Sequence, residues 1–299
     1  FPEHLSKWEL SNAYRESFVQ DQKIIKHEIV EDGPVFENIL TGDDIDVTKF
    51  PAPIWHENDG GRYIGTGTYS VTLDPEDGTL NAGAYRAQVH GPREVGFLTA
   101  RGHHGYIHRE KYKAMGKKMP VCMVLGGDPL SFYFGGTEAP MGTFELDLVG
   151  GLRGKPMQLV KGKVTGLPFP ANAEVVLEGY VNPRDRRFET AESEESGIQG
   201  RHHFHPEWSG YMGKAYKAPT FHCTAVTTRK PESKPIIFAL GVHTSDESNI
   251  DTTVREGAIL ELCHRMQPGI VTDVHIPYSM TDWGGAIIQV KKRSQIDEG

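Results

Sequence analysis

Three side chains in this sequence have the chemistry of a metal site. Asn81 offers an amide oxygen, His104 an imidazole and Glu145 a carboxylate. This ligand set suits Mn²⁺ or Mg²⁺ better than metals that prefer thiolates. One carboxylate leaves a divalent ion incompletely neutralised, and such ions commonly complete their coordination with phosphate oxygens and water. The combination therefore predicts a metal that holds a phosphorylated cofactor.

The backbone between Asn81 and Arg86 must position part of this site. In an uninterrupted strand these two residues would point to opposite faces, because they are separated by an odd number of positions. Gly83 could host a bulge that re-aims the later side chains. The small Ala82 and Ala84 would let backbone N–H groups approach a flat ring. We therefore expect an irregular strand here.

Most of the remaining chain is expected to form sheet. Runs rich in β-branched residues, separated by Gly, Pro and Asp, predict strands. They lie at 23–30, 62–74, 81–89, 95–100, 120–126, 157–166, 173–181, 220–229, 235–242, 270–277 and 285–293. The DPEDG turn at 74–78 predicts a hairpin over 62–88. GTGT at 65–68 lacks the residues of a phosphate-binding loop, so it predicts a bare strand face.

Helices are expected to be few. Hydrophobic periodicity and terminal signals predict them at 4–19, 106–116, 144–152 and 249–266. The acidic segment 189–197 predicts a solvated, mobile loop. GGDPL at 126–130 predicts a turn that ends a strand.

Composition limits the class of protein. The 299 residues can bury a substantial core in one or two domains. No apolar run approaches the roughly 20 residues that cross a bilayer, and the N-terminus does not resemble a signal peptide, so we expect a cytoplasmic protein without membrane contact. The net charge of −8 argues against a nucleic-acid partner. The three cysteines show neither a disulfide pattern nor zinc spacing.

Several segments, in order along the chain, resemble the UbiD-like decarboxylases, which use prenylated FMN. These segments are NAGAYR at 81–86, HH at 103–104, TFELDLVGGLRG at 143–154, PANAEVVLEG at 170–179 and PEWSGYM at 206–212. The resemblance implies a carboxy-lyase that reversibly and non-oxidatively decarboxylates an aromatic or α,β-unsaturated carboxylic acid. It also implies an α+β fold, with a mixed, mostly antiparallel split β-barrel that binds flavin and a few flanking helices.

The resemblance also implies a domain organisation. Residues 1–22 are expected to be an N-terminal helix or linker, and residues 23–299 the prenyl-FMN-binding domain. The family's N-terminal and C-terminal oligomerisation domains are largely absent, so we expect a portion of a longer protein. That protein would form a homodimer or higher homo-oligomer where the C-terminal domain is present. A flavin prenyltransferase would supply the cofactor.

Residue roles follow from the same resemblance. The implied metal ligands are Asn81, His104 and Glu145, for Mn²⁺ or Mg²⁺, with K⁺ as a further candidate ion. His108 remains an alternative to His104, and Asp147 competes with Glu145, although residues two apart on a helix face about 200° away from each other. The implied cofactor-binding residues are Asn81, Ala82, Gly83, Ala84, Tyr85, Arg86, His103, His104, Glu145 and Lys291, with Lys292 as a substitute for Lys291.

Catalysis is expected to involve Arg86 and Glu207. The planar fork of Arg86 would bind the substrate carboxylate with two parallel hydrogen bonds. Glu207 would donate a proton, which requires a pKa raised from about 4.3 towards 6 or 7, with Trp208 as a candidate apolar wall. His202 stands where many relatives have a second carboxylate, so the Glu-Arg-Glu network is expected to be incomplete. His202 is the third candidate catalytic residue.

Two other functions fit the sequence. A His-rich β-barrel hydrolase would use His202, His203, His205 and Glu207 to hold a catalytic metal that activates water. A non-catalytic cofactor-binding subunit would hold flavin without turnover.

Overall fold

The computed structural model contains two compact units, which are residues 25–242 and residues 1–24 together with 243–299. The described residues are 4, 9, 24–55, 57, 59–65, 67–136, 139, 141–198, 203–206, 212–230, 246–277, 280 and 285–294, with only the backbone for 203–206, 212, 246–251 and 254. The helix expected at 4–19 and the strand expected at 235–242 lie outside this set.

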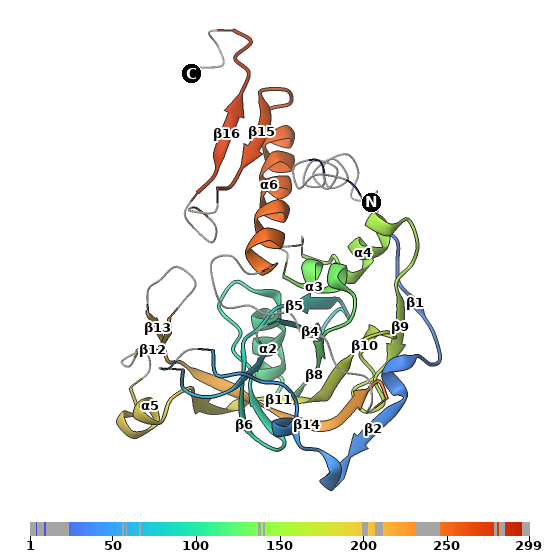
Figure 1. The fold of residues 1–299 in the computed structure, drawn as a ribbon, viewed down its shortest axis with the longest axis vertical. Coiled ribbons are helices and arrows are strands. Elements are labelled where there is room, and N and C mark those ends of the chain that lie inside the picture. The colour runs from blue at the N-terminus through green and yellow to red at the C-terminus, as the bar shows by residue number, and fades with distance from the viewer. Residues whose placement is uncertain are drawn as a thin grey trace. The chain divides into compact units, whose positions relative to one another are not determined.

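A nine-stranded sheet organises the larger unit (Figure 1). Its strand order is β3-β6-β7-β14-β11-β8-β4-β5, and β2 pairs with β14. The pairings are antiparallel. The strands are β2 (Asn38–Thr41), β3 (Tyr63–Gly65), β4 (Thr68–Leu73), β5 (Leu80–Gly83), β6 (Ala87–Gly91), β7 (Glu94–Gly96), β8 (Met119–Leu125), β11 (Val175–Phe188) and β14 (Lys217–Thr228).

The long strand β11 explains why this sheet curls. Its register with β14 shifts between Glu178 and Gly179 and again between Asn182 and Arg186. Such irregularities bend a strand and increase its twist. The expected α+β fold with a mostly antiparallel split β-barrel is confirmed, and the barrel takes the form of a curled, antiparallel half-barrel sheet.

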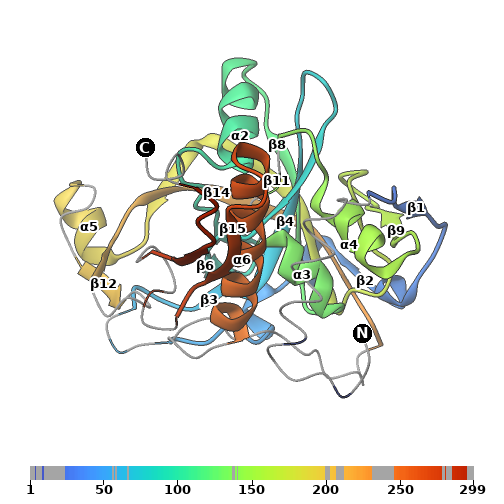
Figure 2. The ribbon, with the colours of Figure 1, turned by 90° about the horizontal axis from the view of Figure 1, so that it is seen from above.

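Smaller elements complete the larger unit. The short helices α3 and α4 lie side by side (Figure 2), and α2 packs against β4, β5, β8 and β11. These elements are β1 (Glu28–Ile29), β9 (Gln158–Lys161), β10 (Pro168–Pro170), β12 (His203–Pro206), β13 (Met212–Lys214), α2 (His104–Ala114), α3 (Pro129–Gly135), α4 (Glu145–Arg153), α5 (Ala191–Ser196), and the 3-10 turns Pro34–Phe36, Gly42–Asp44 and Val47–Lys49.

The hydrophobic core of the larger unit is built mainly on the central strands. β8 has the sequence MPVCMVL and is buried over almost its whole length, as expected for a short continuous apolar run. Fully buried side chains from several strands and loops meet in one cluster, which includes Phe97, Met119, Val121, Leu177 and Phe221. The cluster fixes the sheet on which the candidate site is built.

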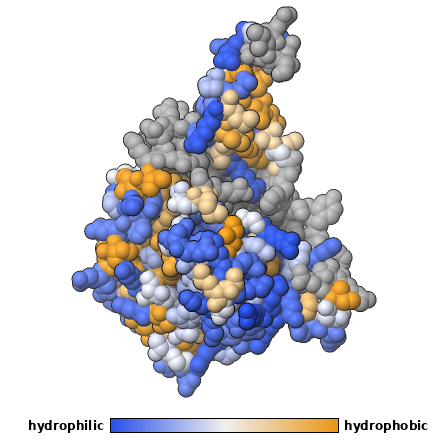
Figure 3. Space-filling view, turned by 180° about the vertical axis from the view of Figure 1, so that it is seen from behind, coloured by the Kyte–Doolittle hydropathy of each residue, from blue (hydrophilic) through white to orange (hydrophobic). Residues whose placement is uncertain are grey.

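Among its described residues, the smaller unit contains one helix and one hairpin. α6 (Asp246–Met266) packs against β15 (Val271–His275), which pairs antiparallel with β16 (Ile287–Val290). Apolar side chains remain on its surface, as Figure 3 shows. They include Leu262, Met266, Ile287 and Val290. None of the described helices has the length and apolar character needed to cross a membrane.

Turn chemistry predicted the β4–β5 hairpin correctly. Asp74 accepts a hydrogen bond from the backbone N–H of Glu76, and Gly78 takes a positive φ of 78° that other residues rarely adopt. The expected irregularity after Asn81 is also present, because β5 ends at Gly83 and β6 begins only at Ala87.

One loop prediction was wrong. The acidic segment 189–197 contains α5, because Thr190 accepts a hydrogen bond from Ser193 N–H and so caps the helix. The strand-ending turn expected at 126–130 is present, because β8 ends at Leu125 and Gly126 and Gly127 both take positive φ. Its last residues begin α3, where Asp128 caps the helix and Pro129 occupies its first turn.

Candidate cofactor and metal site

Helix α4 brings Glu145 to the end of β5. The backbone N–H of Ala82 donates to Oε2 of Glu145 at 2.6 Å. The Glu145 side chain is 2% exposed. Burial raises its pKa to about 8, although hydrogen bonds from the backbone of Ala82 and of Glu145 itself oppose the shift. A cation beside Glu145 would favour its ionised form.

His104 is the first residue of α2 and faces the same carboxylate. Its Nδ1 lies 3.9 Å from Oε1 of Glu145. Burial, and then the neighbouring His103, lower the pKa of His104. The neutral imidazole is the form that binds metals. His103 precedes the helix, and its ring lies edge-on to Tyr85 with centroids 6.2 Å apart.

Asn81 is held by two hydroxyl groups. Its Nδ2 donates to Oγ1 of Thr72 and to the hydroxyl of Tyr85, both at 3.2 Å. Because both bonds use the amide nitrogen, Oδ1 remains available as a ligand. The Tyr85 hydroxyl also accepts the backbone N–H of Gly105 at 2.9 Å, which connects β5 to the first turn of α2. Burial raises the pKa of Tyr85 to about 12.

These donors fit a hard divalent cation. A buried carboxylate with a raised pKa, a neutral imidazole and an amide oxygen are ligands that Mn²⁺ and Mg²⁺ accept. In the described part of the chain, no group of three or more His, Cys, Asp or Glu residues is arranged to hold a metal. A metal at this position would therefore need Asn81 in addition to His104 and Glu145.

The competing residues have other partners. His108 lies 2.9 Å from Oγ1 of Thr72 and 3.8 Å from Oδ2 of Asp74. Asp147 accepts hydrogen bonds from the backbone and the ring of His27, at 2.8 and 2.7 Å. The structure thus places His104, and not His108, beside Glu145.

Arg86 forms a two-pronged ion pair with Glu189. Its Nε and Nη2 donate to the two carboxylate oxygens at 2.8 and 2.7 Å. Glu189 also accepts the backbone N–H of Tyr216 at 2.9 Å and is buried. Two parallel charge-assisted bonds fix the plane of the guanidinium.

Sequence analysis assigned no functional role to Glu189. It fell in the segment interpreted as a mobile loop, and the structure shows that it is a carboxylate partner of Arg86. The expectation of an incomplete Glu-Arg-Glu network stays a prediction, because His202 and Glu207 lie outside the described residues. The available signal was Thr190 followed by Ser193, the pattern of a helix cap that anchors the segment.

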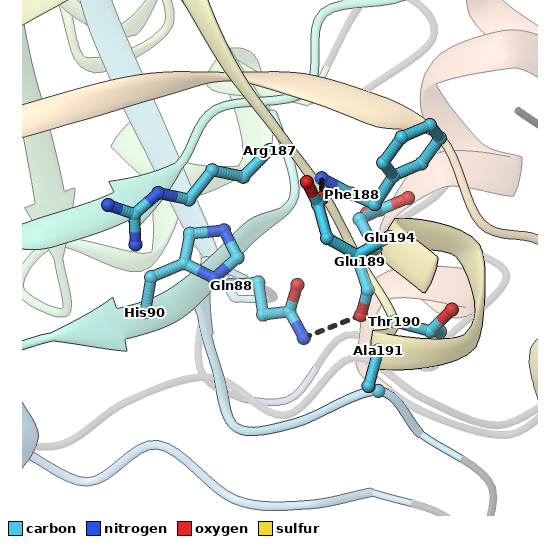
Figure 4. A pocket seen from close by; sticks show the side chains of 9 residues that line it. Gln88, His90, Arg187, Phe188, Glu189, Thr190, Ala191 and Glu194 are labelled. Carbon is cyan, nitrogen blue, oxygen red and sulfur yellow. Dashed lines mark hydrogen bonds between the residues drawn. The ribbon is translucent and has the colours of Figure 1, made fainter. Parts of the chain in front are cut away.

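A pocket of about 400 Å³ adjoins Glu189, the carboxylate of this pair (Figure 4). It lies between β6, the end of β11 and α5, and its lining includes Gln88, His90, Arg187 and Glu194. Gln88 donates to the backbone oxygen of Glu189 at 2.9 Å, shown as the dashed line in Figure 4. The pocket therefore borders the backbone of the residue whose carboxylate holds Arg86.

For several expected site residues, the described part of the structure shows no contact with Asn81, His104, Glu145 or Arg86. Glu207, Trp208 and His202 lie outside the described residues, and only the backbone is described for His203 and His205 in β12. Lys291 belongs to the smaller unit, where its N–H donates to the backbone oxygen of Ile270 at 2.8 Å. Their roles stay predictions.

Residues 28–243 match the family model described as the UbiD 3-octaprenyl-4-hydroxybenzoate carboxy-lyase Rift-related domain. The match covers most of the chain and includes the three expected metal ligands and Arg86. The chain belongs to the UbiD family. This match confirms the family that the sequence resemblance indicated.

Individual relatives agree with this assignment. The chain is 34% identical over 210 residues to the pyrrole-2-carboxylic acid decarboxylase of Pseudomonas aeruginosa, which is 70% of this chain and 40% of that protein. Its fold is similar to an evolved dimeric form of the UbiD-class enzyme HmfF of Pelotomaculum thermopropionicum in complex with prFMN (TM-score 0.81, 26% identity, 95% of this chain and 62% of that chain).

It is also similar to the closed form of the Sedimentibacter hydroxybenzoicus vanillic acid decarboxylase (TM-score 0.82, 26% identity, 97% of this chain and 58% of that chain). The chain spans less than two thirds of the length of each of these relatives.

Proposed function

We propose that this chain is the cofactor-binding part of a carboxy-lyase that reversibly and non-oxidatively decarboxylates an aromatic or α,β-unsaturated carboxylic acid. Family membership supports this proposal, as does similarity to proteins named as decarboxylases of pyrrole-2-carboxylic and vanillic acid. The observation that carries it is that Glu145 contacts both the backbone of Ala82, the residue that follows Asn81, and the ring of His104.

The proposed cofactors are prenylated FMN and Mn²⁺ or Mg²⁺, with K⁺ as an additional candidate. Similarity to the HmfF complex with prFMN supports the flavin. Asn81, His104 and Glu145 would hold the metal, which in turn would neutralise the cofactor phosphate. The backbone of residues 82–85 and His103 would border the flavin, and Lys291 would contact its phosphate. When bound, the prenylated flavin supplies an electron sink for the carbon that loses carbon dioxide.

Arg86 would orient the substrate carboxylate. Its charge is independent of pH in any working range, so it attracts an anionic substrate throughout. Glu189 holds two of its N–H groups and removes the side-chain freedom that a lone arginine would have to lose on binding. The pair thus presents a positioned cation at the edge of β6.

Glu207 would deliver the proton that replaces the carboxylate, with His202 as a neighbour that tunes it. A carboxylic acid can donate near neutral pH when an apolar environment raises its pKa. The assembled enzyme would be a homodimer or higher homo-oligomer, and a flavin prenyltransferase would supply its cofactor.

Co-expression of the chain with a flavin prenyltransferase tests the proposal. We expect purified protein with flavin absorbance, a divalent metal in a one-to-one ratio, and release of carbon dioxide from members of a panel of aromatic and α,β-unsaturated acids. Retained flavin without turnover of any acid would favour a non-catalytic cofactor-binding subunit. Colourless protein with stoichiometric zinc would favour the His-rich hydrolase instead.

A further inference from the structure

A chain of buried polar side chains leads from Asn81 to the surface. Asn81 Nδ2 lies 3.2 Å from Oγ1 of Thr72, which lies 2.9 Å from Nδ1 of His108. Nε2 of His108 lies 3.8 Å from Oδ2 of Asp74, and Lys111 binds that same oxygen at 2.6 Å. Thr72, His108 and Asp74 are each at most 5% exposed. We call these three residues the Asn81 relay.

Charge at the outer end of the relay sets the tautomer of His108. Burial acts to raise the pKa of Asp74, but hydrogen bonds from Lys111 and from the backbone of Glu76 outweigh it and lower the pKa from its ordinary value. Burial lowers the pKa of His108, which favours the neutral ring with a single proton. The ionised carboxylate facing Nε2 favours that proton on Nε2. Nδ1 is then a hydrogen-bond acceptor.

The remaining hydrogen bonds then have a fixed direction. Thr72 must donate its single hydroxyl proton to Nδ1 of His108. Towards Asn81 it can only accept, so the Asn81 amide must turn its nitrogen to Thr72. Tyr85 supports the same orientation, because its hydroxyl accepts from Asn81 and from the backbone of Gly105. With both amide protons used, the amide oxygen faces the other way.

We propose that Thr72, His108 and Asp74 are positioning residues that fix the amide of Asn81 with its oxygen directed to the metal. This inference rests on the proposed function, because it presumes a metal at Asn81, His104 and Glu145. A flipped amide would present two N–H donors to the cation. Without the relay, the Thr72 hydroxyl could donate to the Asn81 oxygen and compete with the metal for it.

Manganese affinity measures the orientation directly. Free Mn²⁺ is followed by electron paramagnetic resonance while the flavin-free chain is titrated with MnCl₂. Thr72→Val keeps the side-chain shape but removes the hydroxyl, and we expect affinity about 10–100-fold weaker, as for other residues that orient metal ligands. Thr72→Ser keeps the hydroxyl but loses the methyl group, and we expect it to bind Mn²⁺ as tightly as the wild type. If Thr72 acted only through packing, Thr72→Ser would not bind Mn²⁺ more tightly than Thr72→Val.

Thr227→Val is the matched control. Thr227 lies on β14 of the same sheet, is fully buried, and its hydroxyl has no hydrogen-bond partner within the described residues. Thr227→Val makes the same chemical change as Thr72→Val at a residue outside the Asn81 relay, so manganese affinity should stay at the wild-type value. Circular dichroism melting of each variant establishes that it is folded.

His108→Leu provides a second route if Thr72→Val does not fold. It frees the Thr72 proton without removing the hydroxyl, and we expect weaker Mn²⁺ binding again. Wild-type affinity in either folded variant would overturn the relay while leaving the proposed metal site intact. Failure of the wild-type chain to bind Mn²⁺ would overturn the metal site itself, and the relay with it.

Discussion

The ion pair between Arg86 and Glu189 gives a prediction whose size follows from the structure. Glu189→Gln removes the negative charge while preserving the shape of the side chain. The glutamine can present one acceptor oxygen, whereas Glu189 accepts bonds from two nitrogens of Arg86 and from the backbone of Tyr216. The new NH₂ group must then face at least one of these donors.

Breaking a buried ion pair costs about 3–5 kcal/mol, and an unsatisfied buried donor costs about 1–3 kcal/mol. The Glu189 side chain is 2% exposed, but that of Arg86 is 23% exposed and retains some solvation. We therefore expect Glu189→Gln to lower the free energy of unfolding by about 2–4 kcal/mol. Released from its partner, Arg86 would also bind the substrate carboxylate less well, which raises KM.

Urea unfolding of the purified chain provides the assay. The dependence of the free energy of unfolding on urea concentration (the m value) should be the same for wild type and variants. Glu192→Gln is the matched control, because it makes the same chemical change at an exposed position three residues away, on α5. It should change the free energy of unfolding by less than about 0.5 kcal/mol. Equal effects of the two variants would refute the view that Glu189 holds Arg86 in place.

The remaining predictions concern the metal and the proton. Glu145→Ala should lose divalent metal and flavin together, since one bridges to the other; unchanged flavin occupancy in metal-free protein would contradict this. Burial raises the pKa of Glu145 from 4.5 to about 8. Between these two pH values, the folded chain without metal holds a proton on Glu145 that the unfolded chain has released. This residue should therefore lower the free energy of unfolding as pH rises from 4.5 to 8. Thermal melting at a series of pH values should show this fall in stability in the wild type but not in Glu145→Gln, and saturating Mn²⁺ should also suppress it. The same pH dependence in wild type and variant would contradict the role of Glu145. Glu207→Gln should retain flavin but abolish deuterium exchange at the substrate carbon, measured by NMR, and exchange at the wild-type rate would remove Glu207 from that role.

Features governed by local physics were predictable from the sequence. The DPEDG turn predicted the β4–β5 hairpin, because Asp and Gly favour that turn wherever they occur together. Hydrophobic periodicity located α2 and α4 to within two residues at each end. The family resemblance also came from short stretches of sequence. Such signals act over a few positions and do not need the rest of the fold.

Helix caps in polar segments were harder to recognise. The glutamates of 189–197 indicated solvent exposure, yet Glu189 is buried and Thr190 begins a helix. Composition describes the average environment of a segment, whereas Glu189 is buried because one particular cation, Arg86, lies opposite it. A local pattern could locate the cap but not that partner.

The sequence alone determined the donor types at Asn81, His104 and Glu145, and with them the class of metal that fits. Tertiary structure decided which imidazole faces Glu145, because His104 and His108 lie on the same helix and only the packing of α2 against the sheet distinguishes them. It also paired Arg86 with Glu189 across 103 positions of the chain. Contacts at that separation depend on strand register and helix packing, which arise only when the whole core assembles.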